Sequence, residues 1–132
     1  MGVLRRAGIL LVVFVLVAGL AATVAGAKKK SRKWASQVTL THPSSTEFTG
    51  IVSSKLAACR KMREVVVYYT DPITGQTQPL SVQRTDGKGH YQVTLASPAY
   101  PGTYKTQVIK QRIKAMHAPQ TCKGAQSAPY TV

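Results

Sequence analysis

REVVVYYT, residues 63–70, is the stretch of this chain that most strongly predicts a β-strand. β-Branched and aromatic residues dominate it, and these residues favour the pleated, half-buried surface of a sheet. Successive side chains of a strand point to opposite faces. One face would therefore carry Val65, Val67 and Tyr69, and the other Val66, Tyr68 and Thr70. The next segment, DPITG at 71–75, predicts a turn because it contains both proline and glycine.

The chain after residue 35 repeats this pattern of short strands and turns. Further strands are expected at 37–41, 47–54, 79–85, 91–95 and 103–113, with short pieces around 121–123 and 129–132. Pro43 is expected to end the first of them, because proline cannot continue a ladder. Expected core residues are Phe48, Ile51 or Val52, Tyr91, Val93, Leu95, Tyr104 and Val108. About seven strands at regular spacing predict an all-β fold, a single small Ig-like β-sandwich.

Two short motifs lie in the second half of the chain, TDGKGHYQV at 85–93 and PGTY at 101–104. They resemble the T-D-x-x-G-x-Y … P-G-x-Y signature of carboxypeptidase-regulatory-like domains, which are transthyretin-like (prealbumin-like) sandwiches of secreted proteins. The chain as a whole resembles small secreted actinobacterial proteins with a signal peptide, a basic spacer, one such sandwich and two cysteines. The resemblance implies a fold but little about activity, since this fold serves as spacer, folding aid or binding platform.

The first motif also has a physical explanation. Asp86 can accept hydrogen bonds from N–H groups of its own turn, and Gly89 can take the positive φ that closes it. Tyr91 and Tyr104 are expected to pack inward from adjacent strands. Asp86 and Gly89 are therefore predicted to have a structural role.

The N-terminal segment 1–27 has the form of a signal peptide with a signal helix. Arg5 and Arg6 precede an uncharged run that ends in Ala-Gly-Ala, the A-x-A form of a cleavage site. Cleavage would leave a basic disordered spacer at 28–35 and the β-sandwich domain at 36–132, secreted or held at the cell envelope. The uncharged run also approaches the length that spans a bilayer, so an uncleaved anchor is the alternative.

Cys59 and Cys122 are the two cysteines of the chain. In an exported domain an even number of cysteines predicts a disulfide. Closing a loop of about 60 residues would restrict the unfolded chain by roughly 4 kcal/mol. A metal site and a reactive thiol are the alternatives. Neither cysteine has zinc-ligand spacing, because His117 stands alone near Cys122.

A disulfide would bring two basic windows to one end of the domain. They contain eight Lys and Arg residues: Lys55, Arg60, Lys61, Arg63, Lys110, Arg112, Lys114 and Lys123. After removal of the leader, 16 Lys and Arg would stand against 4 acids. Such a charge attracts polyanions, and the partners expected outside a cell are anionic envelope polymers, lipids or extracellular DNA. The other interpretation is plain solubility in a chain poor in acids.

Motifs for catalysis are not found. The patterns G-x-S-x-G and H-E-x-x-H do not occur, and the three histidines stand apart. The basic residues do not follow a single-strand-binding pattern, so specific nucleic-acid recognition is not expected. The sequence predicts a secreted or surface-associated, non-enzymatic module with a structural or binding role and with no metal or cofactor. The alternatives are a small exported hydrolase with an unrecognised site and a membrane-anchored module.

Overall fold

The computed structural model describes residues 32–114 and 118–132, which belong to one compact unit. The expected signal peptide and the first half of the basic spacer, residues 28–31, lie outside the described residues. Within the described part, no helix is long and apolar enough to cross a membrane. This part is all-β apart from a short 3-10 turn, η1, at Ala57–Cys59. The predicted fold class is therefore confirmed.

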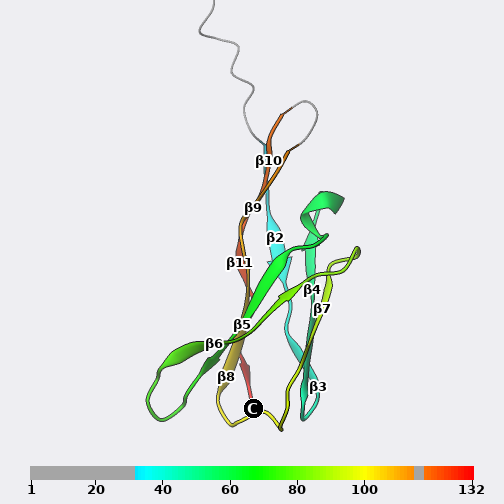
Figure 1. The fold of residues 1–132 in the computed structure, drawn as a ribbon. Helices are drawn as coiled ribbons and strands as arrows, with labels where there is room; N and C mark the ends of the chain where they lie inside the picture. Colours follow the sequence, from blue (N-terminus) through cyan, green and yellow to red (C-terminus); the bar gives the residue numbers. More distant parts are fainter. Residues whose placement is uncertain (1–31, 115–117) are drawn as a thin grey trace, which may run out of the picture. The chain divides into compact units, whose positions relative to one another are not determined.

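Two sheets form a sandwich (Figure 1). The larger sheet has the order β11-β8-β5-β6, and β12 also pairs with β8. Its strands are β5 (Glu64–Thr70), β6 (Thr77–Arg84), β8 (Thr103–Val108), β11 (Ala125–Gln126) and β12 (Tyr130–Thr131). In the smaller sheet, β4 pairs with β2, β3 and β7. Its strands are β2 (Ser36–Val38), β3 (Thr41–Ser44), β4 (Glu47–Ser54) and β7 (His90–Thr94).

The core lies between these sheets and consists largely of the expected residues. Val65 and Val67 of β5 are completely buried, as the alternation in 63–70 predicts. Val52 is buried and Ile51 is exposed, which resolves the alternative in β4. The core cluster comprises Val38, Phe48, Val52, Val65, Val67, Tyr91, Val93, Tyr104 and Val108.

Tyr91 and Tyr104 pack inward from opposite sheets. The expectation of adjacent strands is wrong, because β7 carries Tyr91 and pairs with β4, whereas β8 carries Tyr104 and pairs with β5. The Tyr91 hydroxyl crosses the core and lies 2.9 Å from the hydroxyl of Thr106 in β8. Since a buried hydroxyl without a partner is costly, this contact also helps to fix how the two sheets face each other.

The turn at 86–89 has the expected geometry. The Asp86 carboxylate accepts the backbone N–H groups of Lys88 at 2.8 Å and His90 at 2.9 Å. Gly89 has a φ of +94°, and a Cβ added there would lie 2.2 Å from the Val52 carbonyl oxygen. A residue with a side chain would therefore be strained and would also collide with β4.

Several strand limits differ from the prediction. Residues 32–114 and 118–132 contain twelve short strands, where about seven were expected. The segment 103–113 is two strands, because the chain leaves the sandwich after β8 and enters a third sheet. Pro43 interrupts β3 at a register shift without ending it. Residues 32–34 of the predicted disordered spacer form a strand.

Candidate anion-binding ribbon

The third sheet consists of three strands of three residues each. They are β1 (Arg32–Trp34), β9 (Gln111–Ile113) and β10 (Gln120–Cys122), in the order β1-β10-β9. β1 runs parallel to β10, and β9 runs antiparallel to it. Figure 1 shows β9 and β10 extending from one end of the sandwich. We call this sheet the ribbon.

One face of the ribbon is cationic. Lys33, Thr121 and Arg112 are paired in one row, and side chains of a row share a face. Thr121 is 4% exposed, whereas the two cations beside it are exposed. Lys110 and Lys114 each lie two residues from Arg112, the period that returns side chains to the same face. We define the cationic face as the exposed residues Lys33, Lys110, Arg112, Lys114 and Lys123.

No carboxylate belongs to the three ribbon strands. The sequence contains no Asp or Glu before Glu47 and none after Asp86, so β1, β9 and β10 have no acid. Positive charges gathered on one surface add to one another and attract anions from a distance. The ribbon strands therefore supply no counter-charge of their own, and Glu64 of β5 lines a small hollow together with Lys110.

The ribbon is joined to the sandwich by the expected disulfide. Cys59 of η1 and Cys122 of β10 are bonded, with a Cα–Cα distance of 5.4 Å, and both residues are completely buried. Thr121 is paired between the two cations, and its neighbour Cys122 points to the opposite face. The bond therefore fixes the ribbon from the face opposite the cations.

Arg63 does not belong to the surface cluster. Its side chain is completely buried, so the prediction that it faces an external anion is wrong. Burial lowers the pKa of the guanidinium from its ordinary value, because desolvation disfavours the charged form. The pattern of 63–70 already contained the signal, since residue 63 lies two positions before Val65 and shares its inward face.

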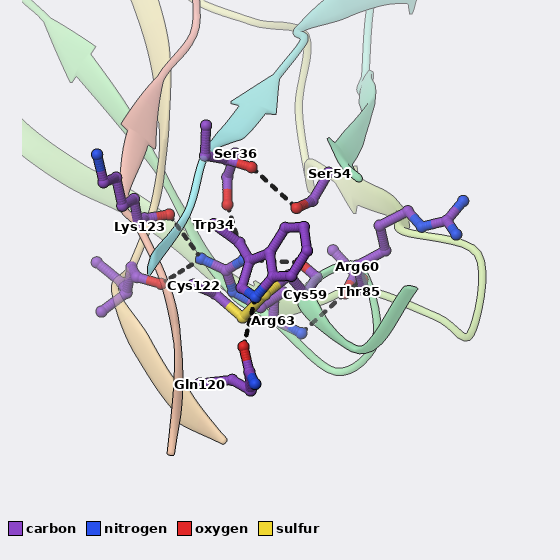
Figure 2. Close-up of a disulfide and its surroundings, with 12 residues drawn as sticks. Trp34, Ser36, Ser54, Cys59, Arg60, Arg63, Thr85, Gln120, Cys122 and Lys123 are labelled. Carbon is purple, nitrogen blue, oxygen red and sulfur yellow. Dashed lines mark hydrogen bonds between the residues drawn. A yellow bond between two sulfur atoms is a disulfide. The ribbon is translucent and has the colours of Figure 1, made fainter. Parts of the chain in front are cut away.

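The Arg63 guanidinium connects four segments around the disulfide (Figure 2). One terminal nitrogen donates to the Cys59 carbonyl at 2.6 Å and to the Ser36 hydroxyl at 3.1 Å. The other donates to the carbonyls of Ile109 at 2.8 Å and Lys123 at 3.1 Å. These acceptors lie on η1, in β2, between β8 and β9, and directly after β10. Arg63 therefore fixes both ends of the β9–β10 hairpin to the sandwich.

Thr85 extends this network from the sandwich side. Its hydroxyl accepts the Arg63 backbone N–H at 2.8 Å and donates to the Arg60 carbonyl at 2.6 Å. Its own N–H donates to the Arg63 carbonyl. The first residue of the TDGKGHYQV motif thus positions Arg63, a role that sequence reasoning did not assign.

The remaining predicted cations form more than one group. Figure 2 shows the side chains of Arg60 and Lys123 extending to opposite sides of the disulfide. Lys110, Arg112, Lys114 and Lys123 belong to the cationic face, while Lys55, Arg60 and Lys61 lie on the loop around η1. The ribbon also contains Lys33, although the sequence predicts a disordered spacer at this position. The expected single cluster is thus divided between ribbon and loop.

Asp86, the acidic residue of the predicted turn, lies in the described part of the chain. No three His, Cys, Asp or Glu side chains gather there at a distance suited to a metal ion. Asp86 lies in an open hollow of about 570 Å³ near His90. Its pKa is lowered by the backbone hydrogen bonds from His90 and Lys88, which favour the ionised carboxylate. That carboxylate stabilises its own turn.

No family model matches this chain, and no curated protein matches it either.

Proposed function

We propose that this protein is an exported, non-enzymatic β-sandwich module that binds an anionic polymer of the cell envelope through the cationic face of its ribbon. The observation that carries the proposal is the cationic face itself, which has five exposed Lys and Arg side chains. Lys33 and Arg112 lie in the ribbon strands, none of which contains a carboxylate, and the other three directly adjoin β9 and β10. The disulfide and the hydrogen bonds of Arg63, which connect the ribbon to the sandwich, support the same conclusion. They hold the charges on a defined backbone, so little conformational entropy is lost when an anion binds.

Export is supported by the signal-like leader and by the disulfide. Disulfides form and persist in oxidising compartments and are rare in the cytosol. The resemblance to carboxypeptidase-regulatory-like domains of secreted proteins agrees with this placement. The mass of the protein isolated from cells and from medium tests it. Cleavage after Ala27 supports export, and a full-length chain retained in the membrane favours the anchored alternative.

A polymer fits the ribbon better than a lipid surface does. Peripheral membrane binding usually combines basic residues with apolar side chains that enter the interface. In the described ribbon, Trp34 and Ile113 are half-buried. A narrow row of charges on a projecting sheet instead suits an extended chain with repeated negative charges.

The test is salt-dependent binding of the protein, purified with its disulfide intact, to linear polyphosphate. A variant with Lys110→Gln, Arg112→Gln and Lys114→Gln removes three charges from the cationic face. Exposed ion contacts are worth about 0.2–1 kcal/mol each, so binding should weaken about tenfold. The matched control, Lys61→Gln, Lys88→Gln and Lys105→Gln, removes three charges outside the ribbon, of which Lys61 and Lys88 are exposed and Lys105 is half-buried in β8.

Added salt should weaken binding of the parent, because the Debye length is only about 8–10 Å near physiological ionic strength. Equal weakening in the ribbon variant and the control would contradict the proposal, because binding would then follow net charge alone. Vesicles with anionic lipid provide the second arm. Tighter binding to vesicles than to polyphosphate would favour a membrane partner.

A further inference from the structure

A groove of about 500 Å³ lies where β1 and β2 meet the end of β4. Its walls include Lys33, Trp34, Gln37, Ser53, Ser54 and Lys55. Small-molecule sites commonly have volumes of about 300–1,000 Å³. The groove shares Lys33 with the cationic face and is otherwise built from different residues.

Trp34 gives this groove a fixed aromatic wall. Its indole nitrogen donates a hydrogen bond to the Gln120 side-chain oxygen, as Figure 2 shows. The Arg32 guanidinium lies 5.3 Å from the ring centroid, within the range of a cation–π contact. Trp34 is paired with Cys122 of the disulfide, so its backbone is also fixed. The ring is half-buried and reaches the groove without being covered by the core.

The polar wall of the groove carries positive charge. Lys33 and Lys55 are exposed cations that come from β1 and from the loop after β4. Gln37 and Ser53 are exposed and are paired with each other across β2 and β4. The Ser54 hydroxyl donates to the Ala35 carbonyl at 2.8 Å, which holds the two walls together. None of the wall residues is acidic.

We propose that this groove binds a sugar unit that carries a phosphate or a carboxylate. The aromatic ring offers a flat apolar surface for the C–H face of a sugar, while the amide and hydroxyl groups can hydrogen-bond its hydroxyls. The two ammonium groups pair with the anionic substituent. The inference rests on the proposed function and specifies the polymer as an anionic glycan, because Lys33 joins the groove to the cationic face.

The experiment uses Trp34 as its own reporter, because it is the single tryptophan of the chain. Glucose 6-phosphate and glucuronate are titrated at constant ionic strength while tryptophan fluorescence is followed. A saturable change is expected with one or both, and the two probes distinguish phosphate from carboxylate. Glucose and inorganic phosphate should each bind more weakly, since each satisfies one wall only.

Two variants of groove residues and one control variant test which side chains contribute to binding. Lys55→Gln should weaken binding of the anionic sugar about fivefold, the effect of one lost ion contact of moderate strength. Lys61→Gln, an exposed cation of the same loop that does not line the groove, should leave it unchanged. Gln37→Ala should weaken binding of the sugar phosphate without changing the response to inorganic phosphate.

Three results would overturn the inference: no saturable change, an equal response to inorganic phosphate, or equal effects of Lys55→Gln and Lys61→Gln. Tighter binding of a nucleoside monophosphate than of glucose 6-phosphate would also overturn it, because base stacking would then explain the Trp34 response. The polyphosphate assay keeps the two proposals apart. If polyphosphate binding depends on Lys110, Arg112 and Lys114 while sugar binding fails, the groove is rejected and the proposed function remains.

Discussion

The sandwich and the ribbon are stabilised by different means. The sandwich has a continuous apolar core between two sheets, built around fully buried residues such as Val65, Val67 and Phe48. The ribbon has strands of only three residues, and sheets this small are marginal in water on their own. A disulfide and one buried guanidinium hold it instead. A projecting cationic surface can thus be made rigid without an apolar core of its own, by a disulfide and hydrogen bonds to the sandwich of the same unit.

The largest expected effect comes from removing the disulfide. The bonded residues are 63 positions apart, and cross-linking a loop of this length stabilises by about 4 kcal/mol on the entropic model. The double variant Cys59→Ser and Cys122→Ser should lose about this much in urea unfolding. Hydrogen exchange should speed up more in β9 and β10 than in β5. Reduction of the parent should reproduce the result, and equal loss of protection in β5 and β10 would contradict the separate stabilisation of the ribbon.

Arg63→Met should have the next largest effect. The substitution keeps an extended apolar chain but leaves the carbonyls of Cys59, Ile109 and Lys123 without their donor. Buried polar groups that lose their partners cost about 1–3 kcal/mol each, and partial entry of water reduces the sum, so we expect a loss of about 3 kcal/mol in urea unfolding.

The matched control for Arg63→Met is Lys61→Met, which changes an exposed residue two positions away. It should change the free energy of unfolding by no more than about 0.5 kcal/mol. Arg63→Met should also weaken polyphosphate binding, although the residue faces away from solvent, because the cationic face loses its fixed backbone. A lower free energy of unfolding together with unchanged polyphosphate binding would contradict this role. It would mean that the backbone of the ribbon stays in place without Arg63.

The same contrast explains how far the sequence could be interpreted. The sandwich follows from local patterns, because alternation places Val65, Val67 and Tyr91 inward and the turn at 86–89 has its own chemistry. The ribbon depends on contacts between residues far apart in the chain. Nothing in the short run RKW at 32–34 indicates that it pairs with residues 120–122. A three-residue strand carries too little periodicity to be distinguished from a disordered basic spacer.

The candidate site was predicted only in part, for a related reason. The disulfide follows from the presence of two cysteines in the sequence. As expected, the basic residues on either side of Cys122 lie close to this bond on one surface: Lys110, Arg112, Lys114 and Lys123. The charge of Arg63 and its closeness to Cys59 in the sequence predict a surface cation, whereas the alternation of 63–70 places it inward. Its inward position follows from the strand pattern, but its acceptors come from four distant segments that no local pattern specifies. Buried polar networks of this kind become visible only in three dimensions.

The smallest expected effect concerns pH and separates the two regions again. The pKa of Asp86 lies below its ordinary value of 3.8, mainly because the N–H groups of His90 and Lys88 hydrogen-bond to the carboxylate. A carboxyl group with a depressed folded pKa stabilises the fold above its unfolded pKa. That contribution is lost as the pH falls through the folded pKa. Stability of the sandwich should therefore decline below about pH 4 through this group.

Asp86→Asn isolates this contribution, because asparagine keeps a side-chain oxygen at the turn but cannot ionise. The variant should be less stable than the parent at pH 6, and the difference in urea midpoint should narrow as the pH falls below 4. Glu47, Glu64 and Asp71 are present in both proteins and cancel in the comparison. The strands of the ribbon contain no carboxylate. The substitution should therefore change hydrogen exchange in β9 and β10 less than it changes exchange in the strands of the sandwich. A difference in midpoint that stays constant down to pH 3 would show that charge on Asp86 does not stabilise its turn, and that the oxygen acceptor alone is sufficient.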